Sequence, residues 1–69
     1  MHYVRADGRY YIAELTRDLW GPVVLVAHGG STPPQIRSLP VDSLVEGERL
    51  LEAIHRRRVA HGYAVERER

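Results

Sequence analysis

The chain contains one long stretch with helical periodicity, which runs from about Ser43 to His61. At 100° per residue, one face of this stretch collects Leu44, Gly47, Leu50, Leu51, Ile54, Arg58 and His61. Ser43 and Glu46 have the spacing of a capping box, which predicts a helix that begins at Ser43 or Leu44. Gly62 stands where a left-handed C-cap residue is wanted, so the helix should end there.

The residues before this helix have the character of β-strands. Tyr10 to Leu15 combine aromatic and β-branched side chains, and the segment 23–27 is the most β-prone of the chain. Asp18 and Gly21 carry turn chemistry, so the two segments should form a hairpin. Alternation over residues 35–39 predicts a third strand that pairs with the second. The segment 63–65 is a candidate for a short returning strand.

A sheet of three or four strands cannot bury an apolar face alone, and the single helix supplies the missing layer. We therefore predict an α+β fold in which a small twisted antiparallel sheet has one long C-terminal helix packed across it. Residues 1–8 would form an N-terminal lead-in or edge strand, residues 9–65 the folded domain, and residues 66–69 a frayed tail.

Length and composition exclude several classes of protein. A chain of 69 residues has one modest core and no room for a two-domain enzyme cleft. It has no cysteine, which excludes disulfides and thiolate metal sites and makes a cytoplasmic setting the default. No stretch approaches the ~20 apolar residues that a membrane span needs, so we expect no membrane partner. The net charge of +1 does not by itself identify a partner.

The polar residues do not form a recognisable catalytic or metal site. His55 and His61 differ by about 240° around the helix, so they cannot share a metal ion. The serines and aspartates show no order typical of a nucleophile, a base and an orienting group, and Ser43 already has a capping role. We expect no enzyme activity, no cofactor, no metal and no small-molecule substrate.

The basic residues are all arginines, and several cluster in the sequence. Guanidinium groups suit bidentate contacts to phosphate, so a surface of arginines around the predicted loop 28–34 would contact nucleic acid. The candidate contact residues are His28, Gly29, Arg37, Arg56, Arg57 and Arg58. The alternative is a solvated helix face, since Glu52 and Arg56 have the favoured i,i+4 spacing. Trp20 is expected to pack at its turn rather than to stack on a base.

Several segments together resemble the WGR domain, a family known from poly(ADP-ribose) polymerases and from small stand-alone bacterial proteins. The resemblance spans residues 9 to 63 and rests on Arg9 to Gly21, Leu25-Val26, Gln35-Ile36-Arg37, Ser43 to Gly47 and His61-Gly62-Tyr63. It implies a twisted antiparallel sheet crossed by one helix. It also implies binding to nucleic acid, most often at DNA ends or breaks, or contact with another domain of the same assembly.

This chain departs from the family at the motif that names it. Where the family reads Trp-Gly-Arg-Ile-Gly, the chain has His28-Gly29-Gly30-Ser31-Thr32, and only Gly29 matches. In the family the tryptophan stacks on a terminal nucleotide and the arginine reaches phosphate, and this chain has neither residue at the matching position. Gly47 also replaces the usual alanine, at a cost in helix propensity of roughly 0.5–1 kcal/mol unless a strand approaches closely there.

Two functional hypotheses follow. In the first, the chain is a non-catalytic WGR-like module that contacts the DNA backbone through the six candidate residues. In the second, it is a protein-interaction or structural module that has lost nucleic-acid binding and associates with another protein or with itself through the sheet. The second hypothesis rests on the segment 23–27, which is apolar on both faces.

Overall fold

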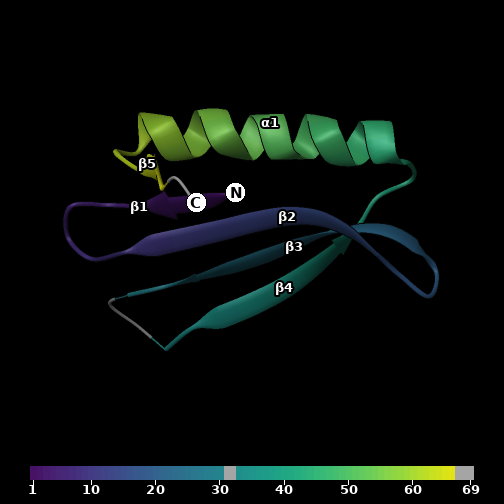
Figure 1. Ribbon diagram of the computed structural model, residues 1–69, viewed down its shortest axis with the longest axis horizontal. Helices are drawn as coiled ribbons and strands as arrows, with labels where there is room; N and C mark the ends of the chain where they lie inside the picture. The colour runs from purple at the N-terminus through teal and green to yellow at the C-terminus, as the bar shows by residue number, and fades with distance from the viewer. Residues whose placement is uncertain (31–32, 67–69) are drawn as a thin grey trace.

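The computed structural model describes residues 1–30 and 33–66 and shows an α+β fold (Figure 1). The elements in chain order are β1 (His2–Val4), β2 (Tyr10–Asp18), β3 (Gly21–Gly29), β4 (Gln35–Pro40), α1 (Leu44–Ala60) and β5 (Ala64–Glu66). The strands form one five-stranded sheet in the order β4-β3-β2-β1-β5, and each pair of neighbours is antiparallel. The predicted fold class is therefore confirmed. Of the predicted tail, residues 67–69 lie outside the described residues.

The central hairpin of β2 and β3 is longer than the sequence predicts. Each strand has nine residues, and the register runs from Tyr10 opposite Gly29 to Asp18 opposite Gly21. The predicted loop at 28–34 was wrong at its first two residues, because His28 and Gly29 still belong to β3. Pairing with β2 extends the strand there, whereas glycine content alone favours a loop.

The chain ends contribute two strands that lie beside each other. β1 pairs with β2 on one side and with β5 on the other, so it is an inner strand rather than a lead-in or an edge strand. The predicted return of the segment after the helix is confirmed, with Val65 opposite Tyr3. Local sequence cannot show that a three-residue strand such as β1 is held between two others.

The helix has the predicted limits to within one residue. The Ser43 hydroxyl accepts a hydrogen bond from the Glu46 amide at 3.2 Å, as an N-cap should. At the other end Gly62 has φ +87° and its amide donates to the Val59 carbonyl at 3.1 Å. This left-handed position ends the helix and turns the chain back toward the sheet.

The core lies between α1 and one face of the sheet (Figure 1). Buried side chains on this helix-facing side are Tyr3, Ala13, Val24 and Val26. Gly47, the buried residue of α1, lies against Leu15 of β2. α1 packs on β2 and β3, and the edge strand β4 is the strand drawn farthest from the helix in Figure 1.

The opposite face of the sheet has no helix packed on it in the described part of the chain. Apolar side chains of Ile12, Leu25, Ala27 and Ile36 contribute to a shallow hollow of about 240 Å³ on this open face. Ile36 is 77% exposed. No helix within residues 1–30 and 33–66 has the length and apolar character needed to cross a membrane.

Candidate nucleic-acid interface

The three consecutive arginines of α1 point in different directions, because neighbouring residues of a helix are about 100° apart. Arg56 is exposed and its Nη1 lies 3.7 Å from Oε1 of Glu52, in the i,i+4 pair that the sequence predicts. Arg57 is exposed on a different side, and Arg58 is half-buried against the sheet. The cluster in the sequence is therefore not a cluster on the surface.

Arg58 is held by aromatic rings. Its guanidinium carbon lies 4.5 Å from the ring centre of Tyr11 and 5.5 Å from that of Tyr63. Its Nε is buried and has no hydrogen-bond partner. Arg5 also lies over Tyr63, at 5.7 Å. Cation–π contacts of this kind make Arg58 a residue that joins helix to sheet.

Arg57 is exposed on a side of α1 that also carries apolar residues. It lines a hollow of about 230 Å³ together with Leu50, Ala53 and Ile54, which follow the helical spacing. Leu50 also lines a second hollow, of about 420 Å³, whose other wall includes Pro40 at the end of β4. Because Leu50 and Arg57 are seven residues apart, they lie on the same side of the helix.

Arg37 projects from β4 on the helix-facing side of the sheet. It is opposite Val26, which in turn is opposite Ala13, and both of these are core residues. Arg37 is exposed because α1 does not extend over β4. We use the name α1–β4 face for Arg37 on the helix-facing side of β4 together with Leu50, Ala53, Ile54 and Arg57 on α1.

His28 and Gly29 occupy strand positions rather than a ligand-binding loop. The ring of His28 stacks on that of Tyr11, with centroids 6.0 Å apart and planes 9° apart. Gly29 is buried, and a Cβ at this position would lie 2.8 Å from the Tyr10 hydroxyl. Tyr10 and Tyr11 project to opposite faces, as the strand pattern predicts. His28 is on the helix-facing side like Arg37, whereas Gly29 is on the open side.

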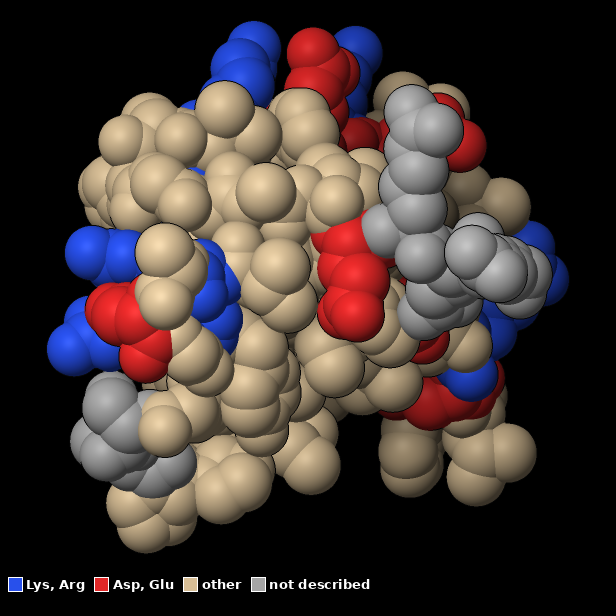
Figure 2. Space-filling view, turned by 60° about the vertical axis from the view of Figure 1, so that its left-hand side comes forward, with Lys and Arg blue, Asp and Glu red and all other residues tan. Residues whose placement is uncertain are grey.

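Ion pairing separates the arginines into two groups. Arg5 and Arg9 both lie near Asp7, at 3.6 and 3.5 Å, and Arg49 pairs with Glu46 at 3.3 Å. On the face drawn in Figure 2, the blue side chains stand in separate groups with red ones close by. Among the described residues, by contrast, no carboxylate pairs with Arg17, Arg37, Arg57 or Arg58.

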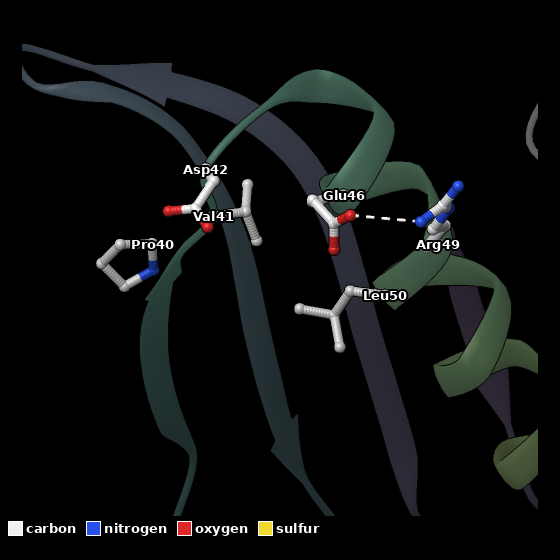
Figure 3. A pocket seen from close by; sticks show the side chains of 6 residues that line it. All are labelled: Pro40, Val41, Asp42, Glu46, Arg49 and Leu50. Atoms are coloured by element: carbon white, nitrogen blue, oxygen red, sulfur yellow. Dashed lines mark hydrogen bonds and ion pairs between the residues drawn. The ribbon is translucent and has the colours of Figure 1, made fainter.

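The residues on the helix-facing side of β2, β3 and β4 explain why these arginines have no carboxylate partner there. The register places no aspartate or glutamate among them, whereas Glu14 is on the open face. Asp42, just before α1, and Glu46 in its first turn line the hollow at the start of the helix (Figure 3). These acids thus lie near the start of the helix, and Arg57 lies near its end.

A partly buried polar pair joins β1 to the helix. The Tyr3 hydroxyl is 3.1 Å from Nδ1 of His55, and the two rings are tilted at 49°. Burial raises the pKa of Tyr3 above its usual 10.0, and the neighbouring Tyr11 raises it further. No group of three or more histidines and acids among the described residues is arranged to hold a metal ion.

The prediction that Trp20 packs at its turn was wrong. Packing was expected, but the side chain is 89% exposed at the tip of the β2–β3 hairpin, next to Leu19, which is 91% exposed. The nine-residue strands carry this tip away from the core (Figure 1). Trp20 lies in a two-residue turn between two long strands, and this position could have indicated that its side chain is exposed.

Comparison of the chain with models of protein families, with curated proteins and with solved structures found no match.

Proposed function

We propose that this chain is a non-catalytic module that binds the phosphate backbone of DNA along the α1–β4 face. The observation that carries the proposal is that Arg37, on the helix-facing side of β4, and Arg57, exposed on α1, have no carboxylate paired to them within the described residues. The resemblance to WGR domains, whose members bind nucleic acid, points to the same class of ligand.

The expected contact is electrostatic and reads little sequence. A guanidinium group can donate two parallel hydrogen bonds to phosphate oxygens, and such contacts position a protein on a duplex without reading bases. Arg58 supports the face from beneath by joining α1 to Tyr11 and Tyr63. The flat, half-buried ring of His28 stacks on Tyr11 on the helix-facing side of the sheet. Gly29 and Arg56 lie away from this face and are left out of the proposed contact.

The test is a titration of short labelled duplexes, blunt and nicked, followed by fluorescence anisotropy. With two or three phosphates neutralised, affinity should fall about tenfold to fortyfold between roughly 50 and 200 mM salt. Arg37→Gln and Arg57→Gln should each weaken binding and lower the salt slope by about one. Arg56→Gln is the matched control, because Arg56 pairs with Glu52 away from the α1–β4 face.

Two results would remove the proposal. One is the absence of binding at tens of micromolar protein at low salt. The other is binding that Arg56→Gln weakens as much as Arg37→Gln or Arg57→Gln does, since that would place the DNA elsewhere on the surface.

A second candidate function is self-association through the open face of the sheet. The specific observation is that Ile36, 77% exposed, stands beside an apolar hollow to which Leu25 and Ala27 also contribute. A projecting apolar side chain next to an apolar hollow can fit a second copy of the same surface around a two-fold axis. Light scattering should then show a dimer that Ile36→Ser dissociates. Val45→Ser, at an exposed position of α1, is the control. A strict monomer at all concentrations would exclude this candidate.

A further inference from the structure

The tip of the β2–β3 hairpin exposes two large apolar side chains, those of Leu19 and Trp20. Trp20 is the single tryptophan of the chain. A soluble surface can carry isolated apolar residues without consequence, but a tryptophan and a leucine together at a projecting tip form an anchor of the kind that dominates protein interfaces.

The backbone of this tip is ordered by its own hydrogen bonds. Oδ1 of Asp18 accepts from the amides of Trp20 at 2.8 Å and Gly21 at 3.1 Å. Gly21 has φ +136°, a conformation that side-chain-bearing residues rarely adopt. A tip that is already ordered loses little conformational entropy when it enters a partner.

Further apolar surface lies at the same end of the molecule. The amide of Val41 donates to the carbonyl of Pro22 at 3.1 Å, which ties the segment before α1 to β3 just after the hairpin turn. In the first turn of α1, Leu44 is 43% exposed and Val45 is 57% exposed. Beside them is the hollow of about 420 Å³, in which Figure 3 shows residues of α1 facing Pro40, Val41 and Asp42.

This end of the molecule is acidic. The turn and the first turns of the helix contain four carboxylates and two guanidinium groups, namely Asp18, Asp42, Glu46 and Glu48 against Arg17 and Arg49. The excess of negative charge disfavours nucleic acid and anionic membrane surfaces here, in contrast to the α1–β4 face.

We propose that the hairpin tip and the first turn of α1 dock a protein partner that presents an apolar pocket with lysine or arginine at its rim. Trp20 fills the pocket, Leu19 and Leu44 extend the apolar contact, and Asp42 faces the basic rim beside Glu46, which also pairs with Arg49. Charge complementarity favours this occupant over DNA, lipid or a second copy. The inference does not rest on DNA binding, since it uses a different set of residues.

The test places a photoreactive benzoylphenylalanine at Leu19 in the full chain, with the same substitution at Ile36 as the matched control, in the native host. The expected product is a cross-link from position 19, absent from position 36, to an identified protein whose cross-linked segment is apolar with flanking basic residues. That protein, purified, should shift the emission of Trp20 to the blue as the tryptophan leaves water. Trp20→Ala should weaken binding about 30-fold, and added salt should also weaken it.

Each of the remaining outcomes overturns the proposal. These are cross-links only to nucleic acid, to lipid or to a second copy of the chain, no cross-link at all, and a cross-linked protein that binds Trp20→Ala as well as wild type. Because Trp20 is almost fully exposed, Trp20→Ala should keep the wild-type circular dichroism spectrum, which separates loss of binding from loss of folding. DNA titration of the same variant should be unchanged, so the two proposals fail independently.

Discussion

Gly47 of α1 lies directly against the side chain of Leu15 on β2. A Cβ at Gly47 would overlap the Leu15 Cδ1 atom, and Cδ2 and Cγ would lie only 3.2 and 3.3 Å away. The glycine that weakens the helix intrinsically is therefore what lets helix and sheet approach each other. Close approach recovers, through packing of Leu15, what the helix loses in propensity.

This contact predicts that Gly47→Ala does not gain the stability that the better helix propensity of alanine would give, because the end of the Leu15 side chain must move away from the new methyl group. We expect a loss of about 1–3 kcal/mol from overpacking, reduced by a gain of roughly 1 kcal/mol in helix propensity. Urea denaturation followed by circular dichroism measures the difference. The double variant Gly47→Ala with Leu15→Val should recover part of the loss, and a double variant no more stable than Gly47→Ala would contradict the assigned clash.

The buried Tyr3 hydroxyl predicts a loss of stability at alkaline pH. Its pKa is raised in the folded state, so above about pH 10 the unfolded chain releases this proton first and binds fewer protons than the folded chain. The free energy of unfolding should then fall as the pH rises through the unfolded pKa, and it should level off above the folded pKa. The test is to measure the free energy of unfolding by chemical denaturation at several pH values between about pH 8 and pH 11.

Tyr3→Phe is the reference for that experiment. It lacks the ionisable group and also the 3.1 Å contact with His55, so it should be less stable by about 0.5–1.5 kcal/mol at neutral pH. The difference in free energy of unfolding between wild type and Tyr3→Phe should become smaller as the pH increases. If this difference stays constant over the same pH range, Tyr3 has the same pKa in the folded and the unfolded chain, which would contradict the prediction.

Alanine substitutions of Arg56 and Arg58 should differ sharply in their effect on the free energy of unfolding. Arg58→Ala removes the guanidinium from between Tyr11 and Tyr63, and we expect a loss of about 1–2 kcal/mol. Arg56→Ala breaks only an exposed ion pair with Glu52 and should change stability by less than about 1 kcal/mol. Thermal or urea denaturation compares them, and equal losses would mean that the aromatic contacts contribute nothing measurable.

The stability of the hairpin tip should depend on its backbone conformation and on the Asp18 side chain, and not on its exposed apolar side chains. Gly21→Ala forces an alanine to φ +136° and should cost about 1–3 kcal/mol. Asp18→Ala removes the acceptor for two amides and should cost about 1 kcal/mol. Leu19→Ser, at a position 91% exposed, should lie within roughly 0.5 kcal/mol of wild type. A marked loss in Leu19→Ser would indicate that the tip packs on the domain in solution.

Local sequence was enough to predict the elements whose causes are local. The cap at Ser43, the left-handed Gly62, the turn between Asp18 and Gly21 and the returning strand after the helix all follow from residue chemistry and spacing over a few positions. The α+β class follows from the same signals, because one amphipathic helix and a small sheet must cover each other.

Only the tertiary structure decided which residues share a surface. Arg56, Arg57 and Arg58 are consecutive in the chain but separate around the helix, and strand pairing places Arg37 on the helix-facing side of the sheet. The inner position of β1 and the exposure of Trp20 were decided in the same way. The physical reason is that helix rotation, strand register and the placement of α1 over β2 and β3 depend on packing between distant segments, which no local pattern of residues records.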